Sequence, residues 1–162
     1  MTQNFFADSD FLTGLFVRRD SRHTMSEKIF NYLQQNELIS GLSDLHISNY
    51  IIVEVIHNLQ GKQIPYVKII EHYKTLNHCH VFHVKPKEIE QAFQTKLAPY
   101  CNHRTHNPPP IGLVDATTLV VMDKKRINSL ISFDEGFDKI PDIFIRIKDT
   151  DVIDQRLLNY YK

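Results

Sequence analysis

The segment NFFADSDFLTGLFV, residues 4–17, decides the fold, because one apolar run ends there at an acid and a second begins at once. The run from Asn4 to Ala7 is typical of a buried strand that ends at Asp8. The stretch from Phe11 to Val17 predicts a helix, which the charged turn at residues 18–21 ends. This order of strand, acid and helix is what a parallel α/β protein requires.

The same alternation continues along the chain. Further strands are expected at residues 45–47, 79–84, 129–133 and 143–147. Helices are expected at residues 26–35, after a Ser48 cap, and at residues 66–76, 86–97 and 112–125. In the helix at 66–76, Val67, Ile70 and Tyr73 lie on one side. Strands that alternate with helices predict an α/β fold with a mainly parallel sheet covered on both faces.

Isolated acids stand beside apolar runs at distant points of the sequence: Asp8, Glu54, Asp115 and Asp134. A carboxylate among apolar residues is costly unless a partner satisfies it. Active sites of parallel sheets lie beyond the carboxyl ends of the strands, where Asp8 and Asp134 are expected. If the acids converge, they repel one another, so either some are protonated or a divalent cation lies between them. Oxygen ligands favour a hard cation such as Mg²⁺ or Mn²⁺.

Each acid also has an ordinary structural explanation. Asp8 or Ser9 could cap the helix that follows, Glu54 could pair with a lysine of a neighbouring helix, and Asp134 could be a turn residue. Asp115 is harder to explain in this way, because GLVDATTLVVM is apolar around it. Taken together, the acids favour one shared site.

Composition and charge exclude several classes. The 162 residues are 42% hydrophobic and 23% charged, which is ordinary for one globular domain. No apolar run has the roughly 20 residues of a membrane span, and the start MTQNFFADSD lacks the pattern of a secretory signal. Two cysteines make a disulfide scaffold improbable, so we expect a cytoplasmic protein without a membrane partner. The formal net charge of zero means that any polyanion is held by local patches and by the metal.

Four segments carry a resemblance to a known family: FFADSDFLTGLF with Asp8, HISNYIIVEVIHNL with Glu54, LVDATTLVV with Asp115, and LISFDEGFDKI with Ser132 and Asp134. In this order, and over most of the chain, they resemble the four motifs of PIN-domain nucleases and are similar to those of VapC-type toxin ribonucleases. The resemblance implies a single PIN-like domain over residues 1–162, with three α/β/α layers and a central sheet of four to five strands.

The resemblance also implies an activity, that of a metal-dependent endoribonuclease. The four acids would be catalytic and would bind Mg²⁺ or Mn²⁺, with Asp134 as a ligand or as an orienter of water. Ser9, Asp10 and Ser132 would support them from a second layer. The partners implied are an RNA substrate, a small antitoxin protein and a second copy in a homodimer. The chain departs from the family pattern at Asp10, a possible fifth carboxylate, and at Gly136, where a second acid is common.

Two further groups of residues carry weaker signals. Histidines and cysteines at residues 78–83 and 101–106 have spacings found in zinc sites, but alternate side chains of a strand face opposite ways, so we expect no zinc there. Residues 100–110 are interpreted as a plain solvated loop. The basic run at residues 124–126 is interpreted as the end of the helix that carries Asp115. The candidates for RNA contact are His103, Arg104, His106, Lys124 and Lys125.

Other functions compete with the toxin. A housekeeping PIN-fold nuclease that processes RNA would carry the same residues. A catalytically inactive RNA-binding module would not need the full set of acids. A phosphoacceptor signalling domain needs an acid after its third strand, and CHVFHVKP offers none.

Overall fold

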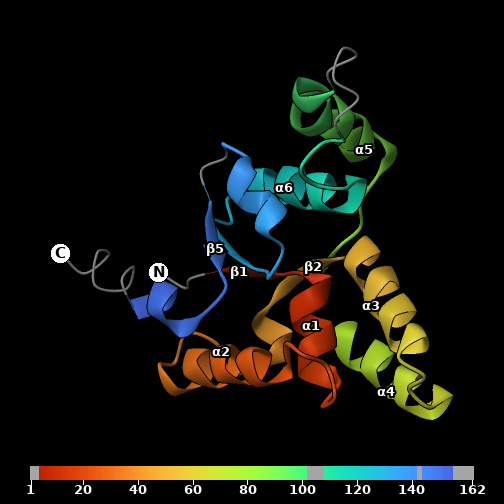
Figure 1. The fold of residues 1–162 in the computed structure, drawn as a ribbon, viewed down its shortest axis with the longest axis vertical. Coiled ribbons are helices and arrows are strands. Elements are labelled where there is room, and N and C mark those ends of the chain that lie inside the picture. Colours follow the sequence, from red (N-terminus) through yellow and green to blue (C-terminus); the bar gives the residue numbers. More distant parts are fainter. Residues whose placement is uncertain (1–3, 102–107, 142–143, 155–162) are drawn as a thin grey trace.

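A parallel sheet lies between two layers of helices (Figure 1). The structure, a computed structural model, describes residues 4–101, 108–141 and 144–154. The sheet has five strands in the order β3-β2-β1-β4-β5, and every neighbouring pair is parallel. The strands are β1 (Phe5–Ala7), β2 (His46–Ser48), β3 (His80–Phe82), β4 (Ser129–Ile131) and β5 (Ile145–Ile147). The prediction of a three-layer α/β/α fold with a parallel sheet of four to five strands is confirmed.

The two helical layers differ in composition. On one side of the sheet lie α1 (Ser9–Phe16), α2 (His23–Gln35), α3 (Asn49–Gly61) and α4 (Tyr66–Leu76), and on the other lie α5 (Pro86–Ala92) and α6 (Leu113–Lys125) (Figure 1). Short helical turns are η1 (Leu42–Asp44), η2 (Phe93–Leu97), η3 (Ala98–Tyr100) and η4 (Glu135–Lys139). The helix expected at residues 86–97 is α-helical only to Ala92 and continues as a π-helix, and α2 begins three residues before the expected start.

The central strand β1 explains where the core and the site lie. Phe5, Phe6 and Ala7 are buried because β1 pairs with β2 on one side and with β4 on the other. The Asp8 N–H donates to the carbonyl of Ile131 at 3.0 Å, which extends the pairing with β4 by one residue. Asp8 is therefore held at the carboxyl edge of the sheet, beside the residues that follow β4.

A buried serine sets the start of α3. The N–H of Ile51 donates to Ser48 Oγ at 3.2 Å, so the predicted helix cap is confirmed. Because Ser48 also ends β2, the cap joins the strand directly to the helix that carries Glu54.

Helix α4 has the predicted bounds, but its apolar side faces solvent. It buries Ile69 and Leu76, whereas Val67, Ile70 and Tyr73 are exposed. Within the residues that the structure describes, no helix has the length and apolar character needed to cross a membrane.

Candidate active site

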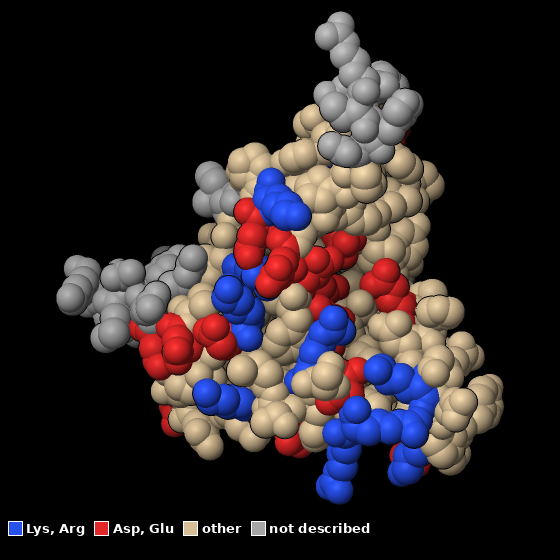
Figure 2. Space-filling model, in the orientation of Figure 1, with Lys and Arg blue, Asp and Glu red and all other residues tan. Residues whose placement is uncertain are grey.

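Acidic side chains meet at the carboxyl edge of the sheet, although they come from four separate segments. Asp8 follows β1, Asp10 lies in the first turn of α1, Asp115 in the first turn of α6, and Asp134 follows β4. Glu54 lies on α3 and reaches the same region. Its proximity is shown by Asp115, whose pKa is raised by the charges of both Asp134 and Glu54. On the face of the molecule that Figure 2 draws, acidic side chains gather in the middle and basic side chains lie mainly below them.

Asp8 is the most deeply buried of these acids, with 4% of its surface exposed. Ser132 Oγ donates to Asp8 Oδ2 at 2.6 Å, and the Ser9 N–H donates to Asp8 Oδ1 at 2.7 Å. Burial raises the pKa of Asp8 well above its ordinary value, and the charges of Asp10 and Asp115 raise it further. Asp8 is also the N-cap of α1, so the structural explanation of this acid as a helix cap is confirmed.

Ser132 and Asp10 hold the segment after β4 against this acid. The N–H of Asp134 donates to Ser132 Oγ at 3.1 Å, and the N–H of Phe133 donates to Asp10 Oδ2 at 2.9 Å. Asp10 Oδ1 is buried and has no hydrogen-bond partner among the described residues. Burial raises the pKa of Asp10 to about 6, against the lowering effect of Arg22. Asp10 is therefore a fifth carboxylate of the cluster.

Asp115 lies where an apolar helix begins. Its Oδ2 accepts from the N–H of Gly112 at 2.9 Å, which satisfies one free donor of the first turn of α6. The pKa of Asp115 is raised to about 6. Burial is the largest cause, and the charges of Asp134, Glu54 and Asp10 add to it. The residues that follow it, 116–122, are all buried, so the helix that presents this acid is itself part of the core.

Glu54 and Asp134 complete the set from the two sides. Burial raises the pKa of Glu54, and a hydrogen bond with the Ser9 side chain opposes this rise. Ser9 and Glu54 line a cavity of about 320 Å³ with Val53, His57 and Asn58. In the described part of the chain Glu54 has no lysine partner. Asp134 is exposed, and its Oδ1 accepts from the N–H of Gly136 at 2.7 Å, as in an ordinary turn.

A buried arginine supports this edge of the sheet, and the sequence analysis missed it. Arg146 on β5 donates from Nε to Asp138 Oδ1 at 2.7 Å, and from Nη1 to the Ser132 carbonyl at 3.3 Å. It also pairs with Asp138 Oδ2, and this pairing lowers the pKa of Asp138. The available signal was a lone arginine in the apolar run IFIRI, which needs an acidic partner if it is buried.

Crowding explains the glycine at position 136. A Cβ atom there would overlap the carbonyl oxygen of Pro110 and would lie 3.1 Å from Asp134 Oδ1. The acid that is common at this position in the family would therefore not fit. The close approach also places the end of the Pro-rich segment against the turn that carries Asp134.

The remaining candidates lie elsewhere. His103, Arg104 and His106 are outside the described residues. Lys124 pairs with Glu88 of α5, and Lys125 lies over the Phe82 ring. Both belong to the last turn of α6, about 15 Å along the helix from Asp115 at 1.5 Å per residue. An RNA contact by either lysine would therefore be distant from the acids.

No zinc site is formed by the part of the chain that the structure describes. The Cys79 thiol donates to the carbonyl of Leu42 at 3.1 Å, and burial raises its pKa to about 11. More generally, no three His, Cys, Asp or Glu side chains of the described residues lie close enough to hold a metal ion as they stand. The acids share an electrostatic environment, but they are not arranged as a ready coordination shell.

Comparisons with known proteins agree with this architecture. No protein-family model and no curated protein matches the chain. Among solved structures, it is similar to VapC20 of Mycobacterium tuberculosis, a toxin that cleaves the sarcin-ricin loop: the identity is 22%, the match covers 84% of this chain and 94% of that one, and the TM-score is 0.63. It is also similar to PAE2754 from Pyrobaculum aerophilum, at 14% identity, 95% and 96% coverage and a TM-score of 0.56.

These similarities show that the chain has the fold of the VapC-type PIN proteins, as the sequence resemblance implied. At such identities they show the fold alone, so the activity has to be argued from the site.

The raised pKa values predict how stability depends on pH. Asp10 and Asp115 have pKa values of about 6 in the folded protein against 3.8 ordinarily, so the folded state binds these protons more tightly. Their contribution to stability is complete below about pH 4 and is lost as the pH rises through about 6. In EDTA, we expect the unfolding free energy of the wild type to fall more steeply over this window than that of Asp115→Asn. Urea titrations at a series of pH values measure both slopes, and parallel curves would contradict the raised pKa of Asp115.

The crowding at Gly136 predicts opposite effects for two glycine substitutions. Gly136→Ala should lower the unfolding free energy by about 1–3 kcal/mol, because the methyl group meets a backbone carbonyl. Gly61→Ala is the matched control, because a Cβ there meets nothing within 4 Å and alanine is favoured in a helix by up to about 1 kcal/mol. Denaturant unfolding compares the two variants. Equal stabilities would show that the turn moves freely away from Pro110.

Proposed function

We propose that the protein is a divalent-metal-dependent endoribonuclease that hydrolyses RNA phosphodiester bonds, and that it is the toxin of a type II toxin–antitoxin pair. The observation that carries the proposal is the cluster of Asp8, Asp10, Glu54, Asp115 and Asp134 at the carboxyl edge of a VapC-like sheet. Carboxylates that raise one another's pKa are costly for stability, so a fold that gathers them has a use for their charge.

The donor set fits a hard divalent cation. All the donors are carboxylate oxygens, and Asp10 Oδ1 is buried without a partner, which leaves one acceptor unsatisfied. Because no three of the described side chains form a ready coordination shell, the ion would have to draw the carboxylates together. Burial is the main cause of the raised pKa values of Asp8 and Asp115, and the charges of the neighbouring acids raise them further. This repulsion would keep the carboxylates apart until a cation binds.

Each residue has a role in this proposal. Asp8, Asp115 and Glu54 would hold Mg²⁺ or Mn²⁺, with Asp134 as a further ligand or as the group that orients water. Such an ion lowers the pKa of water and neutralises charge on the phosphodiester. Ser132 fixes Asp8 by its 2.6 Å hydrogen bond, and Asp10 fixes the backbone before Asp134 through Phe133. The protein's own contribution is to keep the carboxylates aimed at one place.

Similarity to VapC20, a sarcin-ricin loop cleaving toxin, supports RNA as the proposed substrate. We propose that the protein acts in the cytoplasm. The formal net charge of the chain is zero, so the RNA backbone would be held by local basic residues and by the metal.

An exposed apolar surface supports a protein partner. Val53 on α3 and Tyr66, Val67, Ile70 and Tyr73 on α4 are 36–73% exposed. Large apolar side chains gathered on a monomer's surface mark sites of association. We assign this α3–α4 surface to a small antitoxin; a homodimer stays a prediction of the family resemblance.

RNA cleavage tests the catalytic part of the proposal. Purified wild type should cut total RNA with Mg²⁺ or Mn²⁺, less well with Zn²⁺ and not in EDTA, because the proposed ligands are oxygens. Asp115→Asn should abolish cleavage and the rise in melting temperature that Mg²⁺ gives the wild type. Asp123→Asn is the control, since Asp123 lies exposed at the other end of the same helix. A folded Asp115→Asn protein that cleaves like the wild type would refute the assignment.

Growth separates a toxin from a housekeeping nuclease. Inducing the wild-type gene alone should arrest growth, and Asp8→Ala or Asp115→Asn should relieve the arrest, because each removes a proposed metal ligand. Viable cell counts after induction measure the effect. Harmless high-level expression of protein that cleaves RNA when purified would instead favour a housekeeping role, and absence of cleavage under all metals would favour an inactive RNA-binding module.

A further inference from the structure

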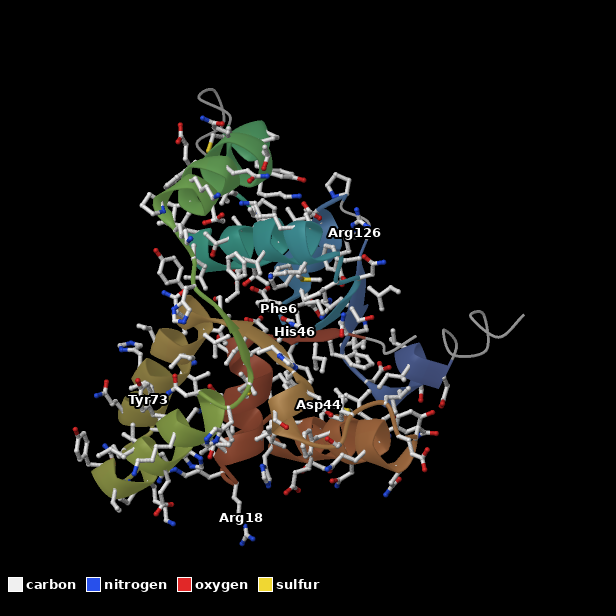
Figure 3. The ribbon with its side chains drawn as sticks, turned by 180° about the vertical axis from the view of Figure 1, so that it is seen from behind. Phe6, Arg18, Asp44, His46, Tyr73 and Arg126 are labelled. Atoms are coloured by element: carbon white, nitrogen blue, oxygen red, sulfur yellow. The ribbon has the colours of Figure 1, made fainter. Side chains whose placement is uncertain are left out.

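A second hollow lies on the sheet face that the α5–α6 layer covers incompletely. Helix α5 packs on α6, on the side of α6 that faces away from the strands (Figure 1). Seen from behind, Phe6 and His46 lie below α6 and away from α5 (Figure 3). The pocket there has a volume of about 380 Å³, and the residues that line it include Phe6, His46, His80, Phe82 and Lys125.

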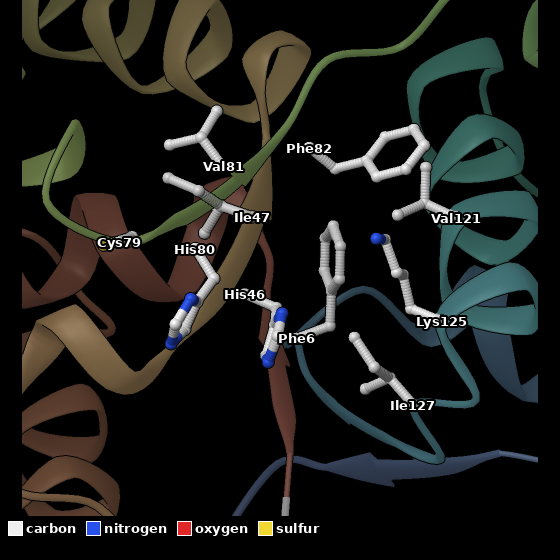
Figure 4. A pocket seen from close by; sticks show the side chains of 10 residues that line it. All are labelled: Phe6, His46, Ile47, Cys79, His80, Val81, Phe82, Val121, Lys125 and Ile127. Carbon is white, nitrogen blue, oxygen red and sulfur yellow. The ribbon is translucent and has the colours of Figure 1, made fainter.

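The strands present unusual residues to this hollow. Parallel strands covered on both faces usually carry aliphatic side chains. Here β2 and β3 begin with His46 and His80, which are partners in register, and their rings stack at 4.7 Å between centroids. Figure 4 shows both imidazoles on one wall of the pocket and Lys125 pointing in from α6. These polar groups face a space of ligand size rather than a packed helix.

The basic groups of this pocket lack a matching acid. Lys125 Nζ lies 5.4 Å from the centroid of the Phe82 ring, and no lining residue is acidic. Within the described residues Lys125 makes no ion pair, whereas the neighbouring Glu88 pairs with Lys124 and Asp123 with Lys96. Asp44 feels the charge of His80, but its Oδ2 already accepts two hydrogen bonds from Ser40. The pocket is therefore a basic site open to an anion.

The other walls are apolar and partly aromatic. Phe6 and Phe82 line the space beside Lys125, and Val121 and Ile127 close it from the α6 side (Figure 4). Aromatic side chains bind flat rings by stacked or edge contacts. We propose that this pocket binds a small planar anion, a ring that bears a carboxylate or a phosphate, with the anionic group on Lys125 and His46 and the ring against Phe6 and Phe82.

This site is separate from the candidate active site. Lys125 lies ten residues after Asp115 on α6, or about 15 Å along the helix. Binding here needs none of the five acids, so the proposal does not depend on the nuclease assignment.

Proton uptake gives the site a distinctive signature. Burial, the charge of His80 and the charge of Lys125 all lower the pKa of His46. A bound anion would favour the protonated imidazole, so it should raise the pKa of His46, and affinity should increase as the pH falls.

Nuclear magnetic resonance of the histidine rings in the full-length protein tests the proposal. Benzoate and adenosine 5′-monophosphate serve as carboxylate and phosphate probes, and inorganic phosphate and benzyl alcohol as half-probes that lack the ring or the charge. At least one full probe should shift the His46 and His80 signals saturably and raise the pKa of His46. The half-probes should bind about tenfold more weakly or not at all, and the stronger full probe identifies the anionic group.

Variants assign the binding to the pocket. Lys125→Met should weaken the better probe about tenfold or more, the loss expected for one hydrogen bond to a charged group. Phe82→Leu should weaken it too, because the ring contact is lost. Lys74→Met is the matched control, since Lys74 also lies exposed in the last turn of its helix, and it should bind like the wild type. The proposal is overturned if neither full probe shifts the signals or if Lys125→Met binds as tightly as the wild type. It is also overturned if only an RNA oligomer shifts them, which would make the hollow part of an RNA path.

Discussion

The repulsion among five carboxylates at one edge of the sheet is the constraint on which the rest of the structure depends. Burial and neighbouring charge raise the pKa values of Asp8, Asp10 and Asp115, so the folded chain holds these groups at a cost. Their positions are fixed by the end of a strand, by the first turns of two helices and by short hydrogen bonds. Ser132 links two of these acids, because one hydroxyl contacts both Asp8 and the backbone of Asp134.

The support for this edge reaches beyond the acids. Arg146 on the outer strand β5 donates to the carbonyl of Ser132 and pairs with Asp138, and it is nearly buried, with 9% of its surface exposed. A buried guanidinium that keeps its partners adds positive charge near an acidic site and holds the two ends of the segment 132–138 in one geometry. On the other side, the carbonyl of Pro110 lies so close to Gly136 that no side chain fits between them. Both contacts restrict the turn that carries Asp134.

Helix α6 connects two different environments of the same sheet. Its first turn presents Asp115 to the carboxylate cluster, and its last turn presents Lys125 to the basic pocket beside His46 and His80. Between them, residues 116–122 are buried. Helix α5 packs on α6, and the pocket beside β2 and β3 is the one proposed to bind an anion. Helix α6 thus separates the acidic site that we propose for a cation from the basic pocket that we propose for an anion.

The sequence by itself determined the order and type of the main elements and the four isolated acids, because both are local properties. Strand and helix periodicities, the Ser48 cap and an acid at the end of an apolar run such as Asp8 can each be recognised within a few residues.

Only the tertiary structure decided which groups meet. The bond from Phe133 to Asp10, the pairing of Arg146 with Asp138, the clash that excludes a side chain at Gly136 and the solvent-facing side of α4 all join or separate residues by packing. Apolar spacing in α4 was the same whichever side met the core, so Val67, Ile70 and Tyr73 could be assigned to solvent only when α3 and the sheet were in place. Periodicity marks a face, whereas the partner of that face depends on elements far away in the chain.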